Sequence, residues 1–382
     1  MAPVVIDLSH AEDPRDAVHL AVQALAEGRL VAFPTETVYG VAASALDESA
    51  VARLLEIKGR RTGHPLTLAI KSADDAVDYV PDIAPLARRL ARRCWPGPIT
   101  LVLKDNHPDS AVQQLPESVQ EAVSPSGTIG LRVPAHPVLQ AVLRLSAGPL
   151  VLSSANRTGQ GDAVTAKEVV QSLGGDVELV LDDGRCKFAQ PSSVVRVHES
   201  GFEVLRAGVF SEAALKRLSG LVILLVCTGN TCRSPMAEAM LKKKVADKLG
   251  CKVEELEDRG IMIASAGIAA MAGGRSAAEA IQAMKERKLD VSQHESQPLS
   301  ERLARHADFV ITMTHGHRDA VIAQWPDAAP RTFTLCDDGR DVADPIGGPI
   351  EWYRRCAEEI DKELDRWVEA IDFTTPALVY TP

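Results

Sequence analysis

The sequence has few cysteines, no long apolar run and no excess of positive charge, and each shortage excludes a class of protein. Its seven cysteines, an odd number over 382 residues, are too sparse for a disulfide framework and favour a reducing compartment. The longest apolar runs, such as Leu221–Cys227, fall far short of the roughly 20 residues that cross a bilayer. The N-terminus has neither the basic start nor the apolar stretch of a signal peptide. We therefore expect a cytoplasmic protein that makes no membrane contact.

The charge distribution argues against tight, nonspecific binding of nucleic acid. The formal net charge is −10; 22 basic and 26 acidic residues precede Gly220, and 20 basic and 26 acidic residues follow it. Nonspecific binding depends on an overall excess of Lys and Arg, although a local basic groove stays open. No Cys or His pairs have the short spacing of a structural zinc site, so we expect no structural metal.

The length and the pattern of apolar residues predict two α/β domains. A chain of 382 residues exceeds one ordinary domain, and 46% hydrophobic with 25% charged residues is typical of globular proteins with proper cores. Strand and helix signals alternate throughout, with a boundary near residues 210–220, which gives expected domains of residues 1–215 and 221–375. The expected strands are Arg29–Phe33, Leu66–Ile70, Ile99–Leu103, Leu221–Val226 and Phe309–Thr312, and the expected helices are Ala50–Lys58, Ala84–Cys94, Glu212–Leu218 and Met236–Leu249.

A compact anion-binding loop follows the apolar run Leu221–Val226. The run does not alternate with polar residues, so it predicts a buried parallel strand. A strand–loop–helix arranges backbone N–H groups and a helix N-terminus around one anion. Gly229 permits the tight turn, and Pro235 suits the first turn of the helix. The complete segment reads Cys227-Thr228-Gly229-Asn230-Thr231-Cys232-Arg233-Ser234-Pro235.

Two side chains of this segment are suited to phosphoryl transfer, one as a nucleophile and one as a phosphate-binding group. The positive field at the start of the loop favours the thiolate form of Cys227, which makes it a nucleophile. Arg233 presents a fork of donors that matches two phosphoryl oxygens. The sequence therefore predicts a cysteine-dependent phosphatase with Cys227 as nucleophile and Arg233 as phosphate clamp. The residues expected to complete the phosphate loop are Thr228, Gly229, Asn230, Thr231, Cys232 and Ser234.

This part of the chain closely resembles the low-molecular-weight protein tyrosine phosphatase family, from Leu221 to about Ile371. The resemblance implies a Rossmann-like parallel sheet, a phosphoprotein substrate and no cofactor. Further features of the family recur in order as Ser265-Ala266-Gly267, His294-Glu295-Ser296, Met313-Thr314 and Asp344-Pro345.

The resemblance also assigns roles to single residues. Asp344 matches the general acid, which protonates the leaving group and later helps water attack the phosphocysteine. Ser234 is expected to hydrogen-bond the thiolate, and Asn230 is expected to support the loop. For Cys232 two interpretations stay open, a reversible disulfide with Cys227 under oxidation or a small buried residue.

Two departures from the tyrosine phosphatases bear on the substrate. Thr231 stands where they usually carry an aliphatic residue, and Ile346-Gly347-Gly348 replaces the paired tyrosines that line a phosphotyrosine pocket. Both features are similar to the bacterial protein-arginine phosphatases of the family. A threonine hydroxyl can engage a guanidinium and orient water, and loss of the aromatic wall favours a planar cation over a phenol. The sequence therefore favours phosphoarginine over phosphotyrosine.

The first half carries polar groups at the ends of apolar segments. The string Phe33–Gly40 ends a strand in a polar turn, and Lys58-Gly59-Arg60 places two cations at the end of a helix, where they suit polyphosphate or carboxylate. The later segments of this kind are Thr128–Pro134, Leu152–Gly159, Ser192–Val195 and Leu205–Gly208.

Taken in this order, the motifs of residues 10–215 resemble the YrdC-like threonylcarbamoyl-AMP synthase family. The resemblance implies a twisted, open mixed sheet with helices, and an enzyme that converts L-threonine, bicarbonate and ATP to threonylcarbamoyl-AMP and pyrophosphate. Mg²⁺ is expected to accompany ATP, and a tRNA-modifying transferase complex is an expected partner. The matching ATP-binding residues are Lys58, Arg60, His64, Ser154, Asn156 and Arg206, and the matching threonine-binding residues are Thr37, Thr128, Arg132 and Ser192.

The first half departs from the family at four positions. Arg61 replaces a usual proline, and His64 stands where asparagine is frequent. Ala69 occupies the place of a histidine close to the amino acid, and Asp162 that of a small hydroxyl residue. These positions bear on affinity and on the choice of amino acid rather than on the fold.

We expect a bifunctional enzyme, with three alternatives. The first half could be a non-catalytic RNA-binding module, which leaves the phosphatase as the only active part. It could instead be a relative of the carbamoyltransferases, although their zinc-finger and acylphosphatase segments are missing. The second half could be a phosphate sensor, although the complete set of Cys227, Arg233 and Asp344 argues against this.

Overall fold

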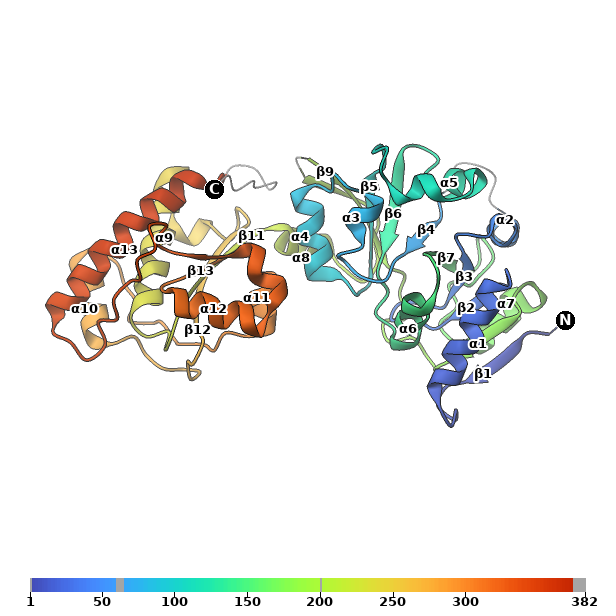
Figure 1. The fold of residues 1–382 in the computed structure, drawn as a ribbon, viewed down its shortest axis with the longest axis horizontal. Coiled ribbons are helices and arrows are strands. Elements are labelled where there is room, and N and C mark those ends of the chain that lie inside the picture. The colour runs from blue at the N-terminus through green and yellow to red at the C-terminus, as the bar shows by residue number, and fades with distance from the viewer. Residues whose placement is uncertain (1, 60–64, 200, 374–382) are drawn as a thin grey trace. The chain divides into compact units, whose positions relative to one another are not determined.

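The computed structural model describes residues 2–59, 65–199 and 201–373. Its contacts divide the chain into two compact units, one up to Leu215 and one from Lys216 onward (Figure 1). Each unit has its own sheet and its own hydrophobic clusters. None of the helices formed by the described residues is long and apolar enough to cross a membrane.

The first unit is built on one mixed sheet of ten strands among the described residues, in the order β1-β8-β2-β3-β7-β4-β6-β5-β9-β10. Parallel pairs such as β4–β6 and β5–β9 alternate with antiparallel pairs such as β3–β7 and β5–β6. The strands are β1 (Val4–Asp7), β2 (Val31–Phe33), β3 (Gly40–Ser44), β4 (Thr67–Ala69), β5 (Ile99–Lys104), β6 (Thr128–Arg132), β7 (Leu150–Ser154), β8 (Leu179–Asp182), β9 (Ser193–His198) and β10 (Gly201–Arg206).

Helices α1 and α6 pack against the part of this sheet formed by β2, β3, β7 and β8, and share a buried cluster with it. Helix α1 begins after Asp13, whose carboxylate accepts a hydrogen bond from the backbone N–H of Arg15, a common start of a helix. The helices are α1 (Pro14–Ala26), α2 (Glu48–Ile57), α3 (Ala76–Tyr79), α4 (Pro85–Cys94), α5 (Glu117–Val123), α6 (Pro137–Leu145), α7 (Ala166–Leu173) and α8 (Glu212–Ser219), the last of which spans the unit boundary; short 3₁₀ turns cover Ala111–Gln114 and Gly174–Asp176.

The second unit has a parallel sheet of four strands among the described residues, in the order β12-β11-β13-β14. Its strands are β11 (Leu221–Cys227), β12 (Ile261–Gly267), β13 (Phe309–Thr312) and β14 (Thr332–Thr334). Its helices are α9 (Arg233–Leu249), α10 (Ala278–Glu286), α11 (Glu301–His306), α12 (His315–Gln324) and α13 (Ile350–Ala370), with 3₁₀ turns at Val253–Glu255 and Pro326–Arg331.

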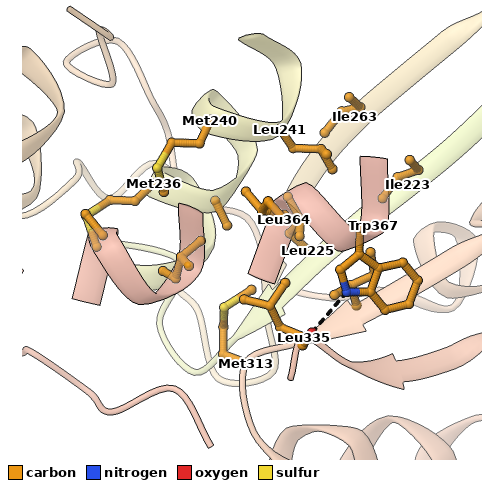
Figure 2. Close-up of a cluster of buried hydrophobic side chains, with 14 of the residues drawn as sticks. Ile223, Leu225, Met236, Met240, Leu241, Ile263, Met313, Leu335, Leu364 and Trp367 are labelled. Carbon is orange, nitrogen blue, oxygen red and sulfur yellow. Dashed lines mark hydrogen bonds between the residues drawn. The ribbon is translucent and has the colours of Figure 1, made fainter. Parts of the chain in front are cut away.

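Strand β11 is buried on both faces, as its unbroken apolar run predicts. Ile223 and Leu225 enter the cluster formed with α9 and α13, whereas Leu224 and Val226 enter the cluster with α12 on the other face. Figure 2 shows the first cluster, in which the indole N–H of Trp367 donates to the Leu335 carbonyl oxygen at 3.0 Å. The last residue of this central strand is Cys227.

The α/β class expected for both halves is confirmed, and the expected strands and helices are present with small shifts at their ends. The largest shift lies after the phosphate loop, where the expected helix Met236–Leu249 begins at Arg233 instead. Arg233 and Ser234, expected in the phosphate loop, are therefore also the first residues of the helix. Pro235 lies in the first turn, where its missing N–H is tolerated.

Replacement of Leu225 by alanine should lower the free energy of unfolding of the second unit by about 2–5 kcal/mol, because it deletes buried methyl groups and leaves a cavity. Guanidinium unfolding measures this change through tryptophan fluorescence, since three of the four tryptophans, Trp325, Trp352 and Trp367, lie in this unit. The control Met262→Ala alters a side chain that is 45% exposed on β12 and should change stability by less than about 1 kcal/mol. Equal effects of the two variants would contradict the burial of β11 between two apolar clusters.

Candidate functional sites

The phosphate loop surrounds the sulfur of Cys227 with hydrogen-bond donors. Cys227 is buried, and its Sγ lies 3.3 Å from the backbone N of Asn230 and 3.0 Å from the hydroxyl oxygen of Ser234. The Ser234 hydroxyl accepts a hydrogen bond from the Asn230 amide at 2.9 Å, so its own hydrogen is available to the sulfur. The arrangement suits a negatively charged sulfur.

The side chain of Asn230 ties this loop to two distant segments. Its backbone has φ +56°, in the left-handed region, which asparagine tolerates better than most residues. Its amide nitrogen also donates to the hydroxyl of Ser265 on β12 at 2.8 Å, and its carbonyl oxygen accepts from the backbone N–H of Gln297 at 2.9 Å. Ser265 in turn donates to Glu238 on α9 at 2.6 Å. The loop conformation is therefore held by tertiary contacts.

Arg233 and Asp344 meet across the mouth of the loop. The Nη2 of Arg233 donates to Oδ2 of Asp344 at 2.5 Å, and Nη1 donates to the Val342 carbonyl oxygen at 3.2 Å. The arginine side chain is 5% exposed, whereas the aspartate side chain is 39% exposed. The carboxylate thus lies at the boundary with solvent, where a substrate can reach it. The structure therefore pairs an arginine of the loop with a carboxylate 111 residues further along the chain.

Other expected loop residues have different surroundings. Thr231 is half-buried, its carbonyl oxygen accepts from Ala277 N–H at 2.9 Å, and its hydroxyl lies 3.6 Å from Cys232 Sγ. Cys232 is a free, buried thiol, 3.8 Å from the hydroxyl of Tyr353, and burial raises the pKa of this thiol. Two histidines to which the sequence assigned no role also contact the loop.

These histidines are His294 and His317. The Nε2 of His294 lies 2.9 Å from the backbone carbonyl oxygen of Asn230. The Nε2 of His317 lies 2.8 Å from the hydroxyl oxygen of Thr228. The stretch containing His294 is one of the family features noted above, but without a role for the ring. The signal that could have found His317 is a histidine in the first turn of a helix that follows β13, the neighbour of β11 in the sheet.

The first unit has a cavity of about 360 Å³ that extends across the middle of its sheet. Five of the expected substrate-binding residues contribute to its lining: Thr128, Arg132, Ser154, Ser192 and Arg206. Its floor is a row of registered residues, in which Leu152, Thr67, Gly130, Val102 and Arg196 follow one another across β7, β4, β6, β5 and β9.

Gly130 keeps the centre of this floor flat. A Cβ atom at this position would lie 3.4 Å from the Thr100 methyl group and 3.9 Å from the Thr67 hydroxyl. A side chain here would therefore project into the cavity. Arg196 at one end of the row was not predicted from the sequence, although its position in β9 directly after the Ser192–Val195 segment could have indicated it.

Lys58 lies beside the cavity in a cage of oxygens. Its Nζ donates to the carbonyl and hydroxyl oxygens of Ser154 at 2.9 and 3.3 Å, and to Oδ1 of Asn156 at 3.0 Å. Lys58, Ser154 and Asn156, three of the expected ATP-binding residues, thus form one cluster. Arg60 and His64, expected in the same group, lie outside the described residues.

A second cluster surrounds Arg132. Its Nη2 donates to the carboxylate of Glu36 at 2.7 Å and to the Thr37 hydroxyl at 2.8 Å, and both charged side chains are 8% exposed. The buried Nε of Arg132 has no hydrogen-bond partner among the described residues. Glu36 was not predicted as a site residue, because its role depends on a contact with a distant strand.

Arg206 and Ser192, which also line the cavity, are joined by hydrogen bonds. The guanidinium donates to the serine carbonyl oxygen at 3.1 and 2.8 Å and to its hydroxyl at 2.9 Å. The structure therefore places an expected ATP-binding residue and an expected threonine-binding residue in direct contact. Of the family departures, Ala69 is buried in β4 beside Arg132 in register, and Asp162 is exposed.

Comparisons with known proteins match the two parts of the chain to two different families. A family model named for Sua5, YciO and YrdC, and described as "Telomere recombination", matches residues 23–208, and a model described as "Low molecular weight phosphotyrosine protein phosphatase" matches residues 222–375. A threonylcarbamoyl-AMP synthase from Pyrococcus abyssi is 33% identical, over 63% of this chain and 72% of its own. A protein-arginine-phosphatase from Geobacillus stearothermophilus is 38% identical, over 39% of this chain and 95% of its own.

A solved structure shares the fold at lower identity. A doubly substituted variant of Sua5 from P. abyssi has a TM-score of 0.51 and 21% identity, and the match covers 87% of this chain and 98% of that one. The chain therefore belongs to two enzyme families, the Sua5/YrdC family of threonylcarbamoyl-AMP synthases through its first unit and the low-molecular-weight phosphotyrosine protein phosphatases through its second.

Proposed function

We propose that the chain is a bifunctional cytoplasmic enzyme, a threonylcarbamoyl-AMP synthase followed by a protein-arginine phosphatase. The observation that supports the synthase is one cavity that has Lys58, Arg132 and Arg206 at or beside its walls. The observation that supports the phosphatase is the placement of Cys227 in a loop that also carries the Arg233–Asp344 pair. We take residues 1–215 and 221–375 as the two catalytic domains.

In the proposed synthase, the amine of L-threonine captures carbon dioxide derived from bicarbonate and forms a carbamate. A carbamate oxygen then attacks the α-phosphorus of ATP, the bond to the β-phosphate breaks, and pyrophosphate leaves. We assign the nucleotide phosphates to the Lys58–Ser154–Asn156 cluster and to Arg206, together with Arg60 and His64. Thr37, Thr128, Arg132 and Ser192 bind threonine. The protein acts by positioning the reactants and stabilising charge.

Magnesium is proposed as the companion of ATP. The cavity lining includes arginines and hydroxyls but, among its described residues, no carboxylate. This composition fits a metal ion that is held mainly by phosphate oxygens and water, as is usual for magnesium in nucleotide sites. The ion would neutralise charge on the leaving pyrophosphate. The product would pass to a separate tRNA-modifying transferase complex.

In the proposed phosphatase, the Cys227 thiolate attacks the phosphorus of a phosphoprotein, and Asp344 gives its proton to the leaving group. Water then attacks the phosphocysteine, Asp344 recovers a proton, and inorganic phosphate leaves. Ser234 and the loop N–H groups bind the charge on the sulfur and on the phosphoryl oxygens. The reaction needs no cofactor.

Phosphoarginine is the proposed substrate in preference to phosphotyrosine. The segment after the acid provides Ile346, which is 65% exposed, and two glycines, so no aromatic side chain of this segment is available to stack on a phenol ring. The Trp352 ring packs against Gly348, where a Cβ atom would lie 2.3 Å from a ring carbon. Thr231 supplies a hydroxyl in the loop for the guanidinium.

The synthase is tested by pyrophosphate release with ATP, magnesium and bicarbonate, with and without L-threonine. Release should depend on threonine and should fall at least about 100-fold in Lys58→Ala, which removes the cation of the phosphate cluster. The matched control Lys167→Ala changes an exposed lysine on α7 and should retain activity.

Thermal unfolding would show whether the Lys58→Ala chain is folded. No threonine-dependent release from the folded wild-type protein, combined with salt-sensitive RNA binding, would replace the synthase by the RNA-binding alternative.

The phosphatase is tested with two peptides of the same sequence, one carrying phosphoarginine and one phosphotyrosine. We expect kcat/KM to be at least about tenfold higher for phosphoarginine. Thr231→Val should remove most of this preference, because valine keeps the shape and loses the hydroxyl. Cys227→Ser should abolish hydrolysis of both peptides. Cys251→Ser, which changes a free cysteine outside the loop, should leave hydrolysis of both peptides intact. A higher kcat/KM for phosphotyrosine would reject the assigned substrate.

A further inference from the structure

His317 is buried at the phosphatase site without a role in the chemistry described above. It lies in the first turn of α12 and is 5% exposed. Its Nε2 contacts the Thr228 hydroxyl at 2.8 Å, while its buried Nδ1 has no hydrogen-bond partner among the described residues. A buried ring nitrogen that lacks a partner destabilises the folded state. The histidine is thus not explained by its contribution to stability.

Arg233 fixes the direction of one of the two hydrogen bonds of the Thr228 hydroxyl. The Nη2 of Arg233 lies 3.4 Å from the Thr228 hydroxyl oxygen, and because arginine has only donors, this oxygen must accept. The hydroxyl hydrogen is then available to His317, whose Nε2 accepts it when the ring is neutral and protonated at Nδ1. The result is a chain from His317 through Thr228 to the phosphate clamp.

Burial and the positive charge of Arg233 keep the ring in the neutral form. Arg233 on α9 faces it, as do Asp341 and Asp344 from the segment that carries the acid. Burial and the positive charge of Arg233 lower the pKa of His317 to about 4, against the opposing effect of the two carboxylates. At neutral pH the ring is therefore neutral, and in the tautomer that we assign, with the proton on Nδ1, Nε2 accepts from the Thr228 hydroxyl.

We propose that His317 is a positioning residue of the phosphatase, which holds the Thr228 hydroxyl so that its oxygen anchors Arg233. The inference rests on the proposed phosphatase function. In the free enzyme Nη2 is shared between Asp344, at 2.5 Å, and Thr228. When a phosphoryl group draws Arg233 away from Asp344, the anchors that remain are Thr228 and the carbonyl oxygen of Val342. A fixed Thr228 thus keeps the clamp in place while the acid is released for proton transfer.

The test compares His317→Leu, which removes the acceptor, with His317→Gln, whose side-chain oxygen can replace Nε2. In the full-length chain, His317→Leu should weaken competitive inhibition by inorganic phosphate and lower kcat/KM about tenfold or more, the range of effects of residues that orient a ligand through another group. His317→Gln should stay within about threefold of wild type. The control Gln324→Leu places the same residue at the exposed end of α12 and should leave activity unchanged.

A double-mutant cycle identifies the route of the effect. Thr228→Val removes the hydroxyl, so adding His317→Leu to it should cause no further loss if the histidine acts through Thr228. Multiplicative losses in the double variant would overturn the proposal. Thr228→Ser, which keeps the hydroxyl, should retain the sensitivity to His317→Leu.

The pH dependence gives a readout that a merely structural residue would not affect. Between about pH 5 and 8 the profiles of kcat/KM for wild type and His317→Gln should have the same shape, because the neutral ring does not titrate there. A wild-type inflection near the ordinary histidine pKa of about 6.5 that is absent from His317→Gln would show a charged ring and overturn the proposal. Calorimetric binding of inorganic phosphate that is lost in Arg233→Ala measures the clamp even if no phosphopeptide is hydrolysed, so failure of the proposed function and failure of this inference are distinguishable.

Discussion

The geometry of the phosphatase site depends on the conformation of Asn230. Its backbone adopts φ +56°, a left-handed conformation that asparagine tolerates better than most L-residues and that hydrogen bonds support here. The support comes from its own side chain, which bonds Ser234, Ser265 and the backbone of Gln297. Because the same turn directs the Asn230 N–H at Cys227 Sγ, the contacts with β12 and with the segment near Gln297 help to hold the donor that faces this sulfur. The geometry around Cys227 is therefore coupled to the packing of β12 and of the segment near Gln297 against the loop.

In the first unit the site is a cavity formed on the mixed sheet. In the proposed function this cavity accepts a large, highly charged nucleotide beside an amino acid, and the reaction uses no protein nucleophile. Small residues at the centre, above all Gly130, leave the floor open, while Arg132, Arg196 and Arg206 also line the cavity. Strands that are distant in sequence supply these residues, since β4, β6, β5 and β9 are neighbours in the sheet. The mixed order of strands is thus what brings the cations around one space.

The sequence was most informative where chemistry is local. The loop from Cys227 to Arg233 is a contiguous strand–loop–helix, so its fold and its two main residues followed from the pattern itself. Asp344 and most of the synthase residues required the family resemblance, whereas for Lys58 and Arg60 the residues alone suggested an anion site but no reaction. Glu36 and His317 were missed because their significance lies in contacts made across 96 and 89 residues. Neither composition nor periodicity contains that information.

Both units hold their functional cations before any substrate arrives. Arg233 is paired with Asp344, Arg132 with Glu36, Arg206 with Ser192, and Lys58 with the oxygens of Ser154 and Asn156. Lys58, Arg132 and Arg233 are buried, and an uncompensated buried charge would be costly, so these three cations need partners when no substrate is bound. These partners also fix the direction of the remaining donors, which then need no reorganisation when the anion binds. In the proposed phosphatase mechanism the partner of Arg233 is the general acid, so binding of the phosphoryl group to Arg233 and release of Asp344 for proton transfer become parts of one event.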